Sequence, residues 1–103
     1  MGILARIDHT AAAAQVGLDL RPTEVLIFGN PKGGTPIMQD AQTSGIDLPL
    51  KVLVWEDAEG KTWIGYNDPV WIGARHGVKT DADPVLRAMR DKLALIVSVA
   101  ASG

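Results

Sequence analysis

The chain contains no cysteine, which excludes disulfide bonds, thiolate catalysis and metal sites built on cysteine. It also lacks a run of about 20 apolar residues, the length that a membrane-spanning helix needs. Its first residues have neither the apolar segment nor the small-residue cleavage pattern of a signal peptide. These absences favour a cytoplasmic protein that makes no contact with a membrane.

The chain also has little excess of charge of either sign. The net charge is -2, and lysine and arginine form no basic arm, so we expect no nucleic-acid partner. The two histidines lie far apart without the spacing of a metal site, and we expect no bound metal. What the chain does have is 47% hydrophobic residues over 103 positions, which suits a single folded domain spanning residues 1–103.

Strand and helix signals alternate along the chain. Apolar stretches predict four strands, at 3–8, 24–29, 50–56 and 62–67. Capping signals and apolar residues at helical spacing predict four helices, at 11–14, from 36 to before 44, at 70–76 and from 83 onward. A tight turn ending at Gly60 joins the third and fourth strands, which requires an antiparallel hairpin. We predict an α+β fold, in the order β-α-β-α-β-β-α-α, with a mostly antiparallel four-stranded sheet covered by helices.

Single residues set the predicted helix ends. Thr10 is the expected N-cap of the first helix, and Gly17 is its left-handed stop. Thr35 is the expected N-cap of the second helix, with Pro36 at the first helical position. Gly77 is the expected stop of the third helix.

The loop after the second strand has the sequence G-N-P-K-G-G-T and allows two interpretations. In one, Asn30, Lys32, Gly33, Gly34 and Thr35 bind an anion at the positive end of a helix. The lysine precedes the glycines, so the loop is not a phosphate-binding Walker A motif. In the other interpretation the same residues make an ordinary turn and cap.

Three further residues carry groups that could move a proton. His9 follows the first strand, as a base or simply as a residue at a helix entry. Tyr66 ends the fourth strand beside Asn67, where its hydroxyl could donate a hydrogen bond. His76 lies at a helix C-terminus, where the dipole favours an imidazolium, and this structural role is sufficient.

Each of three predicted strand-to-helix junctions carries a polar side chain. If those junctions lie on one side of the sheet, His9, Lys32 and Tyr66 form a polar pocket beside helix N-termini. The expectation is geometric, because nothing in the spacing itself joins the three residues.

The chain resembles the domain-of-unknown-function family 302, DUF302. The resemblance rests on five segments: A-R-I-D-H at 5–9, the stretch from R-P-T-E-V to G-T-P-I-M at 21–38, D-L-P-L-K-V-L-V-W-E-D at 47–57, Y-N-D-P at 66–69 and A-R-H-G-V at 74–78. It implies a compact α+β domain found mainly in bacteria and archaea, and it implies no activity. One departure is that family members usually carry a further N-terminal segment with a helix. Its loss would uncover apolar sheet surface, so we expect a chain that is N-terminally truncated and that either oligomerises or is marginally stable.

Three functions from different classes are consistent with these residues. The first is a binding domain for a small anionic ligand, held by Asn30, Lys32, Thr35 and Asn67 together with the two loop glycines. The second is an enzyme that uses His9 or Tyr66 for proton transfer. The third is a homodimeric interaction module. The residues identify no cofactor and do not decide whether a reaction is catalysed.

Overall fold

The computed structural model describes residues 2–29, 31–78 and 83–102. Its elements are β1 (Gly2–Asp8), α1 (His9–Gln15), β2 (Thr23–Gly29), α2 (Pro31–Asp40), the 3-10 helix η1 (Gln42–Ile46), β3 (Leu50–Glu56), β4 (Thr62–Tyr66), α3 (Pro69–His76) and α4 (Asp83–Ser102). The predicted α+β class and the order of strands and α-helices are confirmed, with η1 inserted after α2. The four strands form one antiparallel sheet in the order β1-β2-β3-β4.

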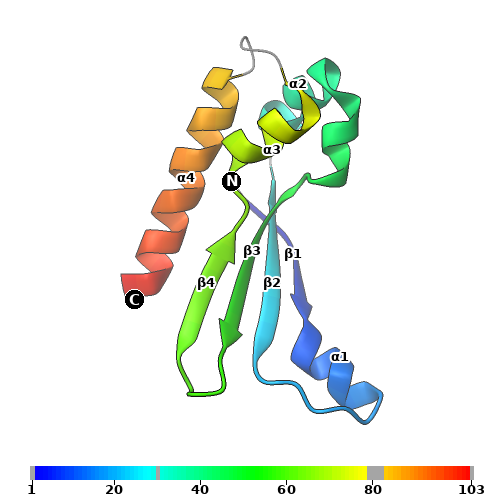
Figure 1. Cartoon of the computed structure of the whole chain (residues 1–103), viewed down its shortest axis with the longest axis vertical. Helices are drawn as coiled ribbons and strands as arrows, with labels where there is room; N and C mark the ends of the chain where they lie inside the picture. Colours follow the sequence, from blue (N-terminus) through cyan, green and yellow to red (C-terminus); the bar gives the residue numbers. More distant parts are fainter. Residues whose placement is uncertain (1, 30, 79–82, 103) are drawn as a thin grey trace.

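The helices lie at different places around this sheet (Figure 1). α2, η1 and α3 gather at the end where β2 finishes and β3 begins, while α1 lies at the opposite end. α4 starts at the α3 end and runs back beside β4. The result is an elongated molecule of 46 × 31 × 22 Å. None of the described helices combines the length and the apolar character that crossing a membrane takes.

One face of the sheet forms the core. Side chains alternate along a strand, so Phe28 on β2 and Val52 on β3 point to the same side. There they pack with Ile72 of α3 and with Leu93 of α4, which is fully buried. The apolar stripe predicted for the last helix is therefore the stripe that covers the sheet. Each such side chain contributes about 1.5–3 kcal/mol by leaving water.

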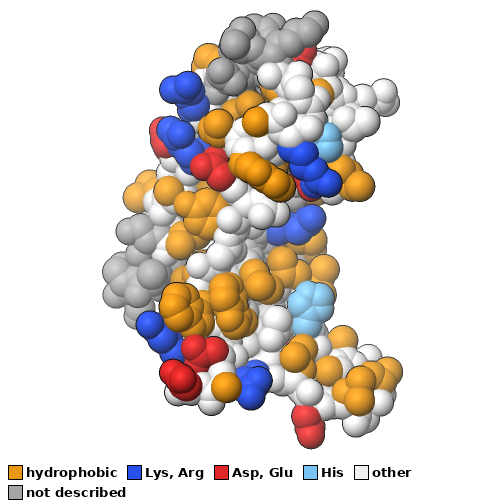
Figure 2. Space-filling view, in the orientation of Figure 1, with side chains coloured by type: hydrophobic (Ala, Val, Ile, Leu, Met, Phe, Trp, Pro, Cys, Tyr) orange, Lys and Arg blue, Asp and Glu red, His pale blue; other side chains and the backbone are white. Residues whose placement is uncertain are grey.

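The other face, here called the outer sheet face, is mostly apolar and accessible. Its apolar side chains are Ile7, Val25, Ile27, Leu53, Trp55 and Trp63, which the register places on the side opposite the core together with Lys51. The Trp55 and Trp63 rings stack with centroids 6.4 Å apart and planes at 17°. Figure 2 shows hydrophobic side chains gathered over the lower part of the sheet and over α1. β2 is central, as its contiguous apolar residues predict, but its outer side is only half-buried.

Two predicted N-caps are wrong. Asp8, not Thr10, caps α1, because its carboxylate accepts from the Ala11 amide at 2.9 Å. The Thr10 hydroxyl instead bridges the carbonyl of Arg21 and the amide of Thr23, tying α1 to the start of β2. The second helix was expected to begin at Pro36, but α2 begins at Pro31, so Thr35 lies inside the helix and caps nothing.

The predicted left-handed glycines are confirmed at the ends of α1 and α3. Gly17 has φ +75° and Gly77 has φ +71°, a region that residues with a Cβ rarely adopt. α3 begins at Pro69, one residue before the predicted range, with Asp68 accepting from the Val70 amide at 2.8 Å and Pro69 at the first helical position.

Candidate ligand-binding pocket

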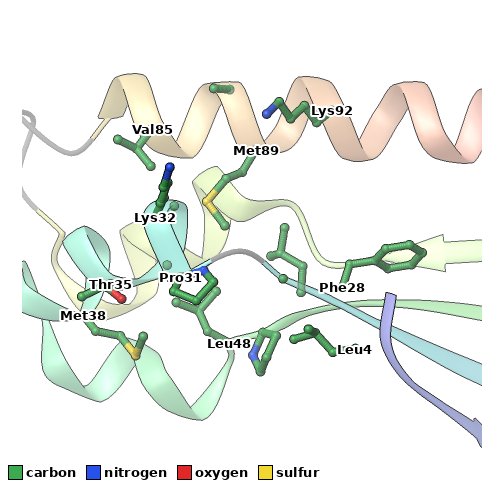
Figure 3. A pocket seen from close by; sticks show the side chains of 16 residues that line it. Leu4, Phe28, Pro31, Lys32, Thr35, Met38, Leu48, Val85, Met89 and Lys92 are labelled. Atoms are coloured by element: carbon green, nitrogen blue, oxygen red, sulfur yellow. The ribbon is translucent and has the colours of Figure 1, made fainter. Parts of the chain in front are cut away.

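A cavity of about 570 Å³ opens where α2, α4 and the ends of β2 and β3 meet. Figure 3 shows α4 along one side of it, with Lys32 extending from α2 toward α4 and with Phe28 and Leu4 at the strand end. Its lining consists of Leu4, Phe28, Gly29, Pro31, Lys32, Gly33, Gly34, Thr35, Met38, Leu48, Pro49, Leu50, Val85, Ala88, Met89 and Lys92. The volume lies in the range of sites that hold small organic molecules.

The walls of the cavity are mostly apolar. Met38 and Met89 contribute flexible thioethers from opposite sides, a residue type that adapts to irregular ligands. Gly33 faces α4, and a Cβ at this position would sit 3.9 Å from the Met89 sulfur, an ordinary contact distance. Such a surface favours an apolar ligand, because burying it releases water from both partners.

The charge in this lining is all of one sign. Lys32 comes from α2 and Lys92 from α4, and the described lining residues include no aspartate or glutamate. The first turn of α2 also lines the cavity through Gly33 and Gly34, and first-turn amides bring a partial positive charge. The lining is thus locally positive on a protein whose net charge is -2.

Four of the predicted ligand-binding residues lie in this lining: Lys32, Gly33, Gly34 and Thr35. Asn67 and Tyr66 lie at the same end of the sheet, because Tyr66 pairs with Val52, but neither is among the lining residues. Asn30 lies outside the described residues. The ligand-binding role of all these residues stays a prediction.

His9 lies at the other end of the sheet, so the expected cluster with Lys32 and Tyr66 is wrong. β1 runs antiparallel to β2 and pairs Asp8 with Glu24, whereas the helix that carries Lys32 follows the far end of β2. The five residue-to-residue steps from Glu24 to Gly29 separate the two ends by about 17 Å. The expectation failed because the first two strands leave the sheet in opposite directions. His9 is the first residue of α1, and the catalytic roles of His9 and Tyr66 stay untested predictions.

The residues of α4 that line the cavity were not among the predicted site residues. Val85, Met89 and Lys92 recur at helical spacing and form one stripe facing α2. The spacing was visible in the sequence, but it indicated only a helix packed on a sheet. In the part of the chain that the structure describes, no three histidine or carboxylate side chains converge in a way that could hold a metal ion.

Comparison with known proteins identifies a solved structure with the same fold. A solved DUF302 protein from Bacillus stearothermophilus superposes with a TM-score of 0.77 at 23% identity, over 91% of this chain and 73% of that one. At this identity the likeness concerns the fold alone.

Curated relatives are closer in sequence. The chain is 48% identical over 89 residues to "Fluoride-specific ion channel FluC 1" of Brucella suis biovar 1 and to "Fluoride-specific ion channel FluC 2" of Brucella melitensis biotype 1. The match covers 86% of this chain but 35% and 33% of those proteins, so the chain spans about a third of the length of the curated relatives it matches. Residues 1–96 match the family described as "Domain of unknown function DUF302", and the chain belongs to this family.

Proposed function

We propose that this domain binds a small amphipathic anion, with the apolar part of the ligand inside the cavity and its charged end beside Lys32 and Lys92. The observation that carries the proposal is one cavity with apolar walls, two lysines and no described acidic residue. Burial of apolar surface supplies affinity at about 25 cal/mol per Å². The lysines select the sign of the ligand charge.

A pair of ligands that differ in one charged group tests the role of the lysines. We expect decanoate to bind more tightly than 1-decanol in isothermal titration. Lys32→Glu and Lys92→Glu are each expected to weaken decanoate binding by about tenfold, and decanol binding little. Lys51→Glu is the matched control, because Lys51 is an exposed lysine outside the lining. Equal binding of the two ligands, or an equal loss in the control, contradicts the proposal.

A second variant blocks the cavity without touching its charge. A leucine at Gly33 would occupy the space between α2 and α4, since this position faces Met89. We expect Gly33→Leu to abolish binding of both ligands. Gln39→Leu adds the same side chain at an exposed position of the same helix and is expected to bind like the wild type. Undiminished binding by Gly33→Leu would place the ligand elsewhere.

The curated relatives favour a second candidate function, an accessory domain of a fluoride channel. Most of this chain matches only a third of proteins that carry the FluC name. We infer that the domain acts on such a channel when the two are joined. Fluoride efflux from liposomes is the measurement, comparing the Brucella suis protein with a form that lacks the matched third and a chimera that carries this chain instead. The candidate is supported if deletion changes efflux and the chimera restores it, and is rejected if all three rates agree.

A further inference from the structure

A chain of hydrogen bonds outside the cavity joins η1 to α3. The Thr43 Oγ1 lies 3.1 Å from His76 Nδ1, and His76 Nε2 lies 2.5 Å from Asp47 Oδ2. Arg75 NH1 donates to both oxygens of Asp47, at 3.1 and 3.0 Å. None of these four described residues lines the pocket. The cluster is thus a second place where chemistry-bearing side chains converge.

The partners of His76 determine which ring nitrogen carries the proton. The His76 hydrogen bond, together with the nearby charge of Arg75, holds the pKa of Asp47 below its usual value, so the carboxylate is ionised and only accepts. A neutral His76 therefore donates from Nε2 to Asp47 and presents Nδ1 as an acceptor. Thr43 then donates its hydroxyl proton to Nδ1. This is the relation of a nucleophile to its general base, with a carboxylate that orients the base.

Solvent exposure differs between the members of this hydrogen-bond chain in the way that a nucleophilic centre needs. The His76 side chain is 9% exposed, whereas Thr43 is open to solvent. Ile46 lies three residues after Thr43 in the 3-10 helix, where such positions eclipse one another. On α3, the guanidinium of Arg75 lies over the Trp71 ring, 5.8 Å from the ring centroid. Both Ile46, on the Thr43 side of η1, and Trp71, beside Arg75, are exposed and offer apolar surface around the cluster.

We propose that Thr43 and His76 form an acyl-transfer centre, positioned by Asp47, that acts on activated esters with an apolar acyl or aryl group. The base and the nucleophile lie 33 positions apart in the sequence, so folding alone assembles the pair. The centre is independent of the ligand cavity and of its proposed function.

The step balances within the residues and the ester. Thr43 Oγ1 forms a bond to the carbonyl carbon, and the bond from that carbon to the leaving oxygen breaks. The Thr43 proton passes to His76 Nδ1 and from there to the leaving oxygen. Water then gives a proton to Nδ1 and forms a bond to the acyl carbon, and the bond from that carbon to Thr43 Oγ1 breaks. Nδ1 passes the proton to Oγ1, which regenerates the hydroxyl, and the carboxylic acid leaves.

The experiment treats the full chain with 4-nitrophenyl butyrate and follows nitrophenolate release and intact mass. We expect release with one butyryl group on Thr43, located by peptide mass spectrometry. Thr43→Val is expected to remove the adduct and to slow nitrophenolate release at least tenfold. His76→Gln is expected to slow release about a hundredfold. Thr43→Ser keeps a hydroxyl and is expected to retain release. Thr62→Val makes the same change at an exposed threonine on β4 and is expected to react like the wild type.

A second measurement keeps the proposal open to refutation if a variant misfolds. The ¹⁵N shifts of the wild-type His76 ring report its tautomer directly, and we expect the proton on Nε2 at a pH where the ring is neutral. Asp47→Asn is expected to change that tautomer and to slow release, while circular dichroism shows a folded chain. Nitrophenolate release unchanged in Thr43→Val, butyryl groups on lysines alone, or a proton on Nδ1 would each overturn the proposal.

Discussion

At the scale of single residues, Asp47 ties η1 to α3 through one carboxylate, which accepts from His76 and Arg75. The His76 hydrogen bond is the largest of the contacts that lower the pKa of Asp47. A carboxyl whose pKa is lower in the folded state stabilises the fold above its unfolded pKa, and this contribution is lost as pH falls through the folded pKa. We therefore expect the free energy of unfolding to decrease as pH drops below about 4.

Urea unfolding at a series of pH values measures how the free energy of unfolding depends on pH. Asp47→Asn is expected to be less stable than the wild type near neutral pH and to lose less stability in acid. Asp19→Asn, at an exposed position in the connector after α1, controls for the loss of one negative charge. Parallel pH curves for the wild type and Asp47→Asn would show that the carboxylate adds nothing to the acid response.

Two leucines of α4 test how far the core rests on single side chains. Leu93 is fully buried in the cluster between the sheet and α3, and Leu95 is 66% exposed on the same helix. We expect Leu93→Ala to cost about 2–5 kcal/mol of unfolding free energy, because it leaves a cavity. Leu95→Ala is expected to change stability by less than about 0.5 kcal/mol. Chemical denaturation of the two variants measures both, and similar losses would contradict the assigned core.

Residue by residue, the sequence singled out four of the sixteen residues that line the cavity. Lys32, Gly33 and Thr35 stood out because their loop combined a cation with turn residues, and the structure places them in the lining. Leu4 and Met89 belong to segments that look like ordinary strand and helix. Only the tertiary fold brings these two residues to that loop, and no local sequence pattern predicts their position there.

At the scale of elements, α2 shows how tertiary packing overrides local signals. Its first turns contain Gly33 and Gly34, which disfavour helix, and it continues through Pro36, which removes one backbone hydrogen bond. The fully buried Ile37 anchors the helix against the rest of the fold. Both Pro31 and Pro36 suit a first helical position, and propensity alone favoured the later one.

The contact between α3 and α4 gives a prediction at the same scale. Gly73 is buried against α4, and a Cβ there would lie 2.4 Å from Leu86 Cδ1. We expect Gly73→Ala to cost about 1–3 kcal/mol by overpacking, and Leu86→Ala about 2–5 kcal/mol. Shortening Leu86 makes room for the new methyl, so the double variant is expected to cost less than the sum of the two.

Gly77→Ala is the control for this cycle. A Cβ at Gly77 meets nothing within 4 Å, and its cost of about 1 kcal/mol comes from the positive φ alone. Its effect is expected to add to that of Leu86→Ala in denaturant unfolding. Additivity in both pairs would mean that α3 and α4 are not in steric contact at Gly73.

At the scale of the whole molecule, the outer sheet face sets an accessible apolar surface against the packed core. Its six apolar side chains lie on the side of the sheet opposite the core. Ile7 and Trp63 are each more than 40% exposed. The shape could not be predicted from the sequence, because gathering α2, η1 and α3 at one end of the sheet depends on contacts between distant segments.

An apolar face of this kind predicts self-association, since contiguous patches on a sheet are costly to leave in water. We expect the wild-type chain to sediment as a species larger than a monomer at micromolar concentration. Ile7→Lys puts a charge on the outer sheet face and is expected to weaken association at least about tenfold. Leu18→Lys makes the same change at an exposed leucine of the connector after α1 and is expected to associate like the wild type. If the wild-type chain stays monomeric and melts cooperatively at high temperature, the outer sheet face is tolerated in water. If association survives Ile7→Lys, the interface lies on another surface.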